Sequence, residues 1–223
     1  MVAVVVFEFS GMRCQPLRRA LCVNQRYGET KVQTSYCSDY SNHVHQLVVT
    51  ISRHFYVTKL GKFKRQSSPF KAVLSRPSTY TKRHIVHYIL TDHFSGLFYA
   101  EVTTSDDVFP IEEFLARAWG EKFEHPLQGE PDLLVVPKSV FDSFPSFSSW
   151  LGQKPIRVVL ATSGFQTGIR SLRTWEEILK IGGSCRYQTG FPPDFIEVQA
   201  NSFDSCVFQT SRHFQKWREG LNT

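Results

Sequence analysis

The sequence predicts an α/β domain in which a mixed sheet is flanked by helices. The β-rich segments 85–90 and 97–102 are separated by turn-forming residues, a pattern that predicts an antiparallel hairpin. The short apolar runs 133–136 and 156–160 are typical of strands buried on both faces. Segments with helical periodicity alternate with these runs, so that strands and helices follow one another along most of the chain.

Three segments between or after these strands have helical patterns. The first spans 105–121, with Ser105 or Asp106 as its expected N-cap. Its expected apolar face consists of Phe109, Ile111, Phe114, Leu115 and Ala118. The second spans 141–151, and the third spans 169–181 and should end at the two glycines 182 and 183.

The Phe and Trp side chains of the second segment recur every three residues, which favours a buried helix face over a platform for stacked bases. They are Phe141, Phe144, Phe147 and Trp150. After residue 183 we expect a C-terminal α/β addition. It comprises strands at 195–198 and 206–209, then a helix from Ser211 with Phe214, Trp217 and Leu221 on one face.

We expect two parts in the chain: a basic N-terminal extension over residues 1–66 and the α/β domain over residues 67–223. Within the extension, apolar residues at spacings of three and four predict one helix over 39–55. A run of cations between residues 59 and 83 contains no acid and predicts a basic linker with at most one strand.

Charge is distributed unevenly along the chain. Residues 1–90 hold 14 Lys and Arg against 3 Asp and Glu, whereas the remaining residues hold 12 against 17, within a net charge of +6. Such a basic segment suits a polyanionic partner or an acidic surface of its own domain. No apolar run is long enough to cross a bilayer, so we expect a soluble, cytoplasmic protein without membrane contact.

Two segments resemble the catalytic core of retroviral-type integrases and DDE transposases, members of the RNase H-like superfamily. The segment YILTDHFSG, residues 88–96, followed by LFYAE, residues 97–101, resembles the second and third strands of those cores. Strand 156–160, the loop SGFQTG at 163–168 and the next helix are similar to the last core strand, loop and final helix. The clearest resemblance covers residues 84–181 and implies an RNase H-like mixed sheet once a first strand upstream of Ile85 is supplied.

The resemblance also implies three metal-binding carboxylates, which the matching positions lack. No Asp or Glu occurs between Asp39 and Asp92, where the first strand must lie. The fourth strand ends in Val135-Val-Pro-Lys138, and the final helix continues after Gly168 with Ile, Arg and Ser. Because Mg²⁺ needs carboxylate oxygens, we expect no catalytic residues, no metal and no cofactor in this chain.

The leading hypothesis is therefore a pseudoenzyme: a non-catalytic, integrase-like or transposase-like protein that binds DNA or another nucleic acid, as an accessory or a remnant of a mobile genetic element. The candidate contacts are Lys59, Lys62, Lys64, Arg65, Lys71, Arg76, Lys82, Arg83, Lys138, Arg170 and Arg173. The alternative is that these cations are ordinary surface side chains that contact solvent.

Two other hypotheses remain open. One is a protein–protein interaction module or homodimer that uses the exposed hairpin edge or the C-terminal helix. The other is a divergent metal-dependent nuclease that uses Asp92, Glu101 and Asp132. Metal clusters built on His84, His87 and His93 with Asp92 are disfavoured by strand alternation. Clusters built on Cys14, Cys22 and Cys37 with His43 or His45 are disfavoured by spacing.

Overall fold

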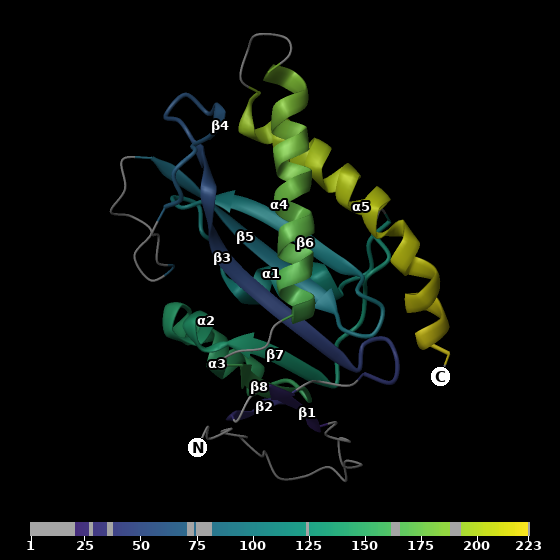
Figure 1. Cartoon of the computed structure of the whole chain (residues 1–223). Helices are drawn as coiled ribbons and strands as arrows, with labels where there is room; N and C mark the ends of the chain where they lie inside the picture. Colours follow the sequence, from purple (N-terminus) through teal and green to yellow (C-terminus); the bar gives the residue numbers. More distant parts are fainter. Residues whose placement is uncertain are drawn as a thin grey trace.

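Figure 1 shows the computed structural model, which describes residues 21–26, 29–34, 38–70, 74, 82–123, 125–161, 166–187 and 193–222. Its main feature is a six-stranded mixed sheet. The strands of this sheet are β3 (Val44–Val57), β4 (Phe63–Arg65), β5 (Arg83–Asp92), β6 (Phe98–Thr104), β7 (Leu133–Pro137) and β8 (Arg157–Ala161). Two further strands, β1 (Leu21–Arg26) and β2 (Glu29–Thr34), pair with each other in a separate antiparallel sheet.

The strands of the large sheet lie in the order β6-β5-β3-β7-β8, with β4 paired to β3. β3, β5 and β6 are antiparallel neighbours, whereas β7 and β8 run parallel to β3. The first three core strands thus form a meander, and the next two are added beside the first strand. This is the strand order of an RNase H-like sheet, as the sequence predicts.

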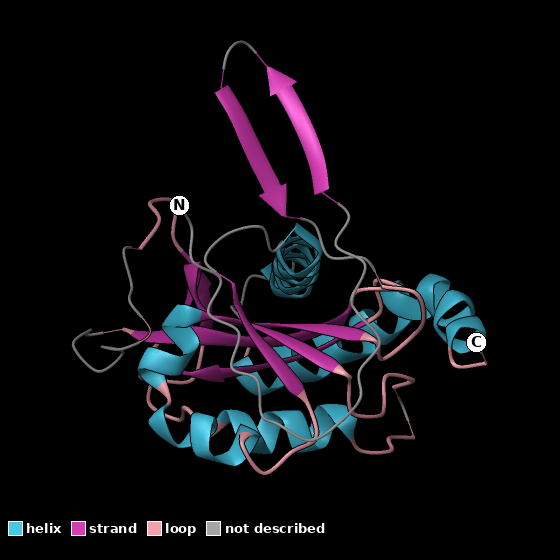
Figure 2. Cartoon of the chain, turned by 90° about the horizontal axis from the view of Figure 1, so that it is seen from below, coloured by secondary structure: helices cyan, strands magenta, loops and turns pink. Residues whose placement is uncertain are grey.

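Helices cover both faces of the sheet. They are α1 (Ile111–Trp119), α2 (Lys138–Ser143), α3 (Pro145–Leu151), α4 (Gln166–Tyr187) and α5 (Phe195–Gly220). Side chains of α1, α2 and α3 share one buried cluster with β3, β5 and β7, while α4 and the first half of α5 share the other with β3, β5 and β6. Figure 2 shows α4 nearly end-on at one side of the sheet and helices on the opposite side.

The helix expected over 39–55 is wrong, because this segment contains the central strand β3. Leu47, Val49 and Ile51 are buried on the α1 side, and Val48 is buried on the α4 side. A strand that is buried on both faces does not alternate between apolar and polar residues. The apolar residues of β3 also fit the spacing of a helix, so the pattern did not distinguish the two. The sheet therefore begins upstream of residue 67, where we expected the domain to start, and β3 supplies the missing first strand.

The C-terminal strands expected at 195–198 and 206–209 are also wrong, since both segments belong to the single helix α5. The C-terminal addition is therefore helical, and the expected helix from Ser211 is its last part. α4 likewise continues past Gly182 and Gly183 instead of ending there. Gly182 lies where α5 packs closely, since a Cβ on it would be 3.4 Å from the hydroxyl of Ser202.

The other elements agree with the sequence, with changes at their ends. The hairpin of β5 and β6 and the strands β7 and β8 lie where they were predicted. α1 begins at Ile111, after Pro110, so neither Ser105 nor Asp106 caps it. Pro145 divides the helical segment 141–151 into α2 and α3, and Phe147 is fully buried, as expected of a core side chain.

Candidate nucleic-acid interface

Three elements meet at one place on the sheet: β3, the end of β7 and the start of α4. β3 and β7 pair in parallel, with Val44 opposite Leu133 and Gln46 opposite Val135. The backbone N–H of Gly168, in the first turn of α4, donates to Oε1 of Gln46 at 2.8 Å. The side-chain amide of Gln46 thus links the first strand directly to the final helix.

The groups that hold this junction together are neutral. Val44, Leu133, Val135 and Ala161 form a small apolar cluster across β3, β7 and β8. On the next strand, the hydroxyl of Thr91 donates to Ser171 of α4 at 2.9 Å. β3, β7 and β8 contain no Asp or Glu. The junction therefore holds the helix to the sheet through packing and neutral hydrogen bonds.

The first acid along α4, Glu176, faces a buried histidine. Its Oε1 lies 4.0 Å from Nε2 of His87, and neither ring nitrogen of His87 has a hydrogen-bond partner among the described residues. Burial lowers the pKa of His87 to about 3 and raises the pKa of Glu176. At neutral pH this histidine is uncharged, and it makes no ion pair with the carboxylate.

The acids that a divergent nuclease would need lie in separate environments. Asp92 is fully buried and accepts hydrogen bonds from the N–H groups of Asn42 and Ser95 at 3.0 and 2.8 Å, and burial raises its pKa. Glu101 binds Arg117 of α1 at 2.8 Å. Asp132 accepts a hydrogen bond from the hydroxyl of Tyr40. In the part of the chain that the structure describes, no three His, Cys, Asp or Glu side chains gather in a way that could hold a metal ion.

The cations of the expected basic linker gather at the other end of β3. Lys59, Lys62, Lys64 and Arg65 lie in the β3–β4 hairpin (residues 55–65), with the exposed ones being Lys59, Lys64 and Arg65. Nζ of Lys62 pairs with Asp194 at 2.9 Å. Nε of Arg83, which begins β5 nearby, lies 3.8 Å from Asp106. Lys59, Lys64 and Arg65 form no ion pair with any described residue, so their charges face solvent.

Two aromatic rings lie beneath one of these cations. Nζ of Lys82 is 4.4 Å from the ring centroid of Tyr56 and 5.8 Å from that of Phe70. The two rings meet edge-on at 6.3 Å, and Phe70 also packs edge-on against His84 at 3.9 Å. Phe70 stands within the basic run of the sequence, but its contact with Tyr56 could not be predicted from that run. Tyr56 lies opposite His84 in the pair of β3 and β5. This position could be recognised only if the register of β3 were known.

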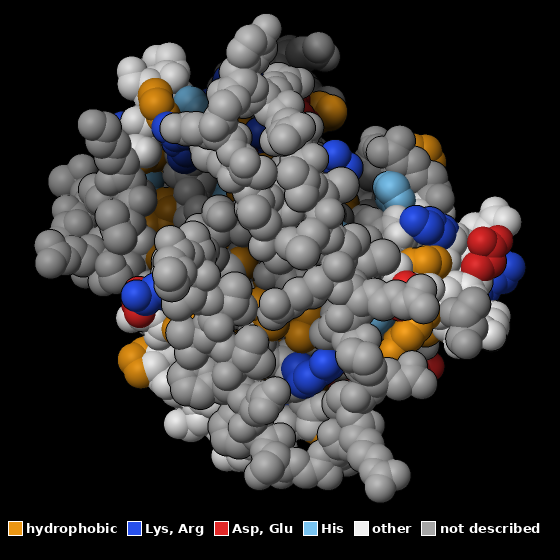
Figure 3. All heavy atoms as spheres, turned by 60° about the horizontal axis from the view of Figure 1, so that its bottom comes forward, with side chains coloured by type: hydrophobic (Ala, Val, Ile, Leu, Met, Phe, Trp, Pro, Cys, Tyr) orange, Lys and Arg blue, Asp and Glu red, His pale blue; other side chains and the backbone are white. Residues whose placement is uncertain are grey.

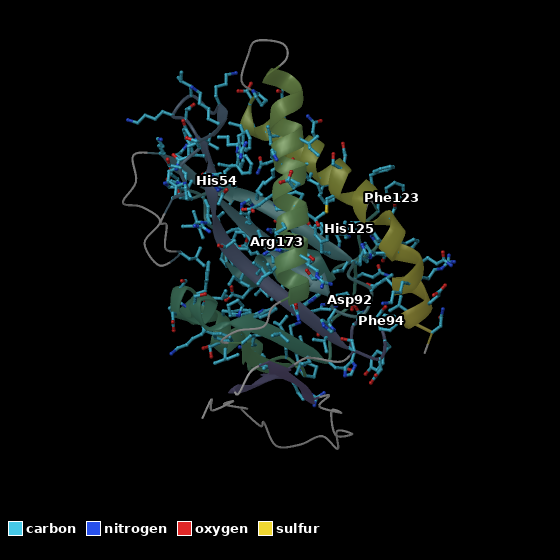
Figure 4. All side chains as sticks on the ribbon, in the orientation of Figure 1. His54, Asp92, Phe94, Phe123, His125 and Arg173 are labelled. Atoms are coloured by element: carbon cyan, nitrogen blue, oxygen red, sulfur yellow. The ribbon has the colours of Figure 1, made fainter. Side chains whose placement is uncertain are left out.

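The remaining candidate cations do not join this group. Lys138 is the first residue of α2, and Arg170 and Arg173 lie on α4. Figure 4 places Arg173 on α4 where it crosses the sheet, away from His54 at the hairpin end. On the face in Figure 3, the described Lys and Arg side chains stand in separate spots. Lys71 and Arg76 lie outside the described residues.

Structural neighbours of this chain are retroviral integrase catalytic cores. Two solved structures of the HTLV-2 integrase catalytic core domain in complex with magnesium are similar to it, one dimeric and one trimeric. The dimeric form has a TM-score of 0.44 at 14% identity, covering 76% of this chain and 86% of that one. The trimeric form has a TM-score of 0.43 at 16% identity, covering 76% and 85%. These similarities are too low to indicate a shared activity. The fold is instead identified from the order of the strands in the sheet.

No protein-family profile matches the sequence, and no curated protein matches it either. Among the described helices, none is both long and apolar enough to cross a membrane.

Proposed function

We propose that this chain is a non-catalytic, integrase-like domain that binds nucleic acid through the β3–β4 hairpin and the start of β5. The observation that carries this proposal is a set of exposed cations at one end of the sheet that form no ion pair with a described residue: Lys59, Lys64 and Arg65, with Lys82 above two aromatic rings. Phosphates bind such cations and release counterions, and aromatic rings offer an apolar surface to a sugar or base.

The lack of catalysis is supported by the junction of β3, β7 and α4. Two-metal phosphodiester chemistry needs several carboxylates converging on one point. At this junction Gln46, Thr91 and Ser171 make neutral hydrogen bonds, and Val44 and Val135 are apolar. A kinship with mobile-element integrases and transposases is part of the same proposal, supported by the strand order and the YILTDHFSG segment.

Binding of the purified protein to short single-stranded and double-stranded DNA and RNA across a salt series, with Mg²⁺ present, tests this proposal. We expect binding that weakens steeply with salt, because each phosphate contact contributes a slope of about −0.9 in log K against log salt for duplex DNA. We expect no strand cleavage over the same time. Salt-insensitive binding, or none at low salt, would contradict the proposed interface.

The double variant K64E/R65E tests the location of the interface. It should weaken binding and reduce the salt slope by about two units, one for each lost phosphate contact. The matched control is K216E/R218E, which makes the same change in charge near the end of α5, far from the hairpin in Figure 1. If both double variants weaken binding equally, the effect comes from net charge and the hairpin is not the interface.

A protein-binding role is the second candidate, and one observation favours it. Between α4 and α5 there is a hollow of about 310 Å³ lined by Ile178, Ile181, Asp204, Ser205 and Phe208. Ile181 and Phe208 are exposed apolar side chains. Light scattering at high protein concentration tests self-association through this hollow, and a monomer throughout would count against a homodimer.

A further inference from the structure

The tip of the β3–β4 hairpin presents an exposed leucine. Leu60 is 86% exposed, and it lies in the turn between Val57 and Phe63. The turn is closed by the N–H of Thr58, which donates to the carbonyl of Lys62 at 2.9 Å, and Gly61 has a φ of +77°. A left-handed residue at this point suits glycine, and the N–H of Gly61 also donates to the carbonyl of Thr58 at 3.0 Å. The leucine is therefore held outward by a closed turn.

The tip is also supported from behind by the start of α5. The N–H of Phe195 donates to the carbonyl of Gly61 at 3.0 Å, and the N–H of Phe63 donates to the carbonyl of Pro193 at the same distance. The ion pair of Lys62 and Asp194 adds a third link. A tip held in this way loses little conformational freedom when it binds, which favours a defined insertion over a loose surface contact.

Cations lie on both faces of the hairpin. Lys64 pairs with Tyr56, and Arg65 pairs with Phe55, so the two side chains point to opposite faces of the strand pair. A flat anionic surface would meet the cations of one face only. A groove with an anionic wall on each side would meet both faces at once, and a duplex nucleic acid has such grooves.

From these contacts we infer that Leu60 is a wedge that enters the minor groove of duplex DNA and partly unstacks a base step, while Lys64 and Arg65 bind the phosphates on either side. This inference extends the proposed function and depends on it. Apolar side chains inserted in this way kink the duplex, and the lost stacking is offset by the added phosphate contacts.

The test uses the full chain with a DNA duplex that carries 2-aminopurine, whose fluorescence rises when it unstacks, and a donor–acceptor dye pair at the duplex ends. The protein should raise both the 2-aminopurine fluorescence and the energy transfer between the ends. Leu60→Ala should abolish both changes and weaken binding on the order of tenfold, with its salt slope unchanged. Leu60→Met, which keeps an apolar side chain of similar length, should retain both signals.

Phe123→Ala is the matched control, because Phe123 is also a large exposed apolar side chain and lies in the segment after α1, away from the hairpin (Figure 4). It should bind and unstack DNA like the unchanged protein. Equal thermal unfolding of the Leu60→Ala and unchanged proteins would show that the substitution leaves the fold intact. Unstacking that persists in Leu60→Ala, or binding without any unstacking, overturns the wedge and leaves the proposed function standing.

Two further outcomes are distinguishable. If the unchanged protein does not bind the duplex even at low salt, the proposed function and the wedge both fail. Vesicles of phosphatidylcholine with one third phosphatidylserine serve as the second probe. If Leu60→Ala weakens binding to these vesicles while duplex binding stays unchanged, the leucine inserts into a membrane surface and the wedge is overturned.

Discussion

At the residue scale, the end of α5 is fixed by a close contact at Gly220. Its carbonyl accepts from the N–H of Ser41 at 3.2 Å, and the Ser41 hydroxyl donates to the carbonyl of Trp217 at 2.6 Å. A Cβ on Gly220 would lie 2.5 Å from that hydroxyl oxygen and 2.6 Å from the Phe94 ring. Only glycine allows this approach, since real Cβ contacts are longer.

Gly220→Ala should therefore lower the free energy of unfolding by about 1–3 kcal/mol, because the added methyl group must push Ser41 or Phe94 aside. Chemical denaturation followed by circular dichroism measures this change. Gly152→Ala is the control, since the nearest atom to a Cβ there is a carbonyl oxygen at 3.5 Å. Equal stability of the two variants would show that α5 ends farther from Ser41.

Buried histidines make the fold sensitive to acid. Burial lowers the pKa of His45 and His87 to about 3 and that of His125 to about 4, each from an ordinary value of 6.5. Below pH 6.5 the unfolded chain takes up protons that the folded chain cannot, so stability falls as the pH falls. Between pH 7 and pH 5 each histidine should remove about 2 kcal/mol. This is an upper value for His45 and His87, because Asp92 at 3.9 Å and Glu176 at 4.0 Å would attract the proton.

His87→Gln tests this effect at one site. The variant should lose about 2 kcal/mol less stability than the unchanged protein between pH 7 and pH 5, whatever its stability at pH 7. Denaturant titrations at the two pH values give the comparison. Parallel losses in both proteins would mean that His87 titrates in the folded state as it does in the unfolded chain.

The candidate site also shows, residue by residue, what sequence could predict. The cluster of Lys59, Lys64 and Arg65 could be predicted, because neighbours in sequence stay neighbours in a hairpin. The distance of Lys138, Arg170 and Arg173 from that cluster could not, because it depends on strand order. Leu60 could not be recognised either, since its exposure follows from the turn geometry.

At the element scale, α5 crosses the domain and is fastened near both ends. It begins beside the β3–β4 hairpin, and Gln199 donates to the carbonyl of Val102 on β6 at 2.7 Å. Near its other end, Nδ1 of His213 forms a hydrogen bond with the carbonyl of Ser95 at 2.9 Å. Trp217 is buried in the cluster that includes β3 and β5. The helix thus packs within its own chain along most of its length.

Trp217→Ala should cost about 3–5 kcal/mol of stability, since it empties a buried position. Phe214→Ala is the control on the same helix, and we expect less than about 1 kcal/mol because Phe214 is partly exposed. Thermal unfolding of both variants measures the difference. If Phe214→Ala is the more damaging variant, Trp217 is not the side chain that anchors this end of the helix. If the effect of Phe214→Ala depends on protein concentration, this helix face binds a second copy.

Elements differed in how well the sequence predicted them. Turn-forming residues connect β5 and β6, so the local sequence was sufficient to predict this hairpin. β3 was mistaken for a helix because it is buried on both faces at the centre of the sheet. α5 was divided into strands because Phe195, Val198 and Cys206 are β-prone residues whose burial comes from α4 and β6.

At the scale of the whole molecule, the affinity for divalent metal ions depends on where the acidic side chains lie. The carboxylates of Asp92, Glu101 and Asp132 accept hydrogen bonds from Ser95, Arg117 and Tyr40, respectively, and no three metal-ligating side chains gather among the described residues. A bound divalent cation stabilises a fold by about 2.7 kcal/mol at one hundred times its dissociation constant. Because the described residues contain no group of three such ligands, we expect these ions to contribute no such stabilisation.

We therefore expect 10 mM Mg²⁺ or Mn²⁺ to shift the midpoint of thermal unfolding by less than about 1 °C. A specific site at saturation would raise it by several degrees in a chain of this size. Differential scanning fluorimetry, with a monovalent salt at matched ionic strength as the reference, measures the shift. A rise of the unfolding midpoint by several degrees with Mn²⁺ would support the hypothesis of a metal-dependent nuclease.

The contact between Ser41 and Gly220 joins the two ends of the described stretch 38–222 at one corner of the molecule. The domain is therefore close to a closed ring of chain, and a short linker from residue 222 to residue 38 would complete it. New ends could then be opened in an exposed loop such as the one at Phe123. Which strand is synthesised first would then depend on where the new chain ends are placed. The sheet itself does not require β3 to be synthesised before β5.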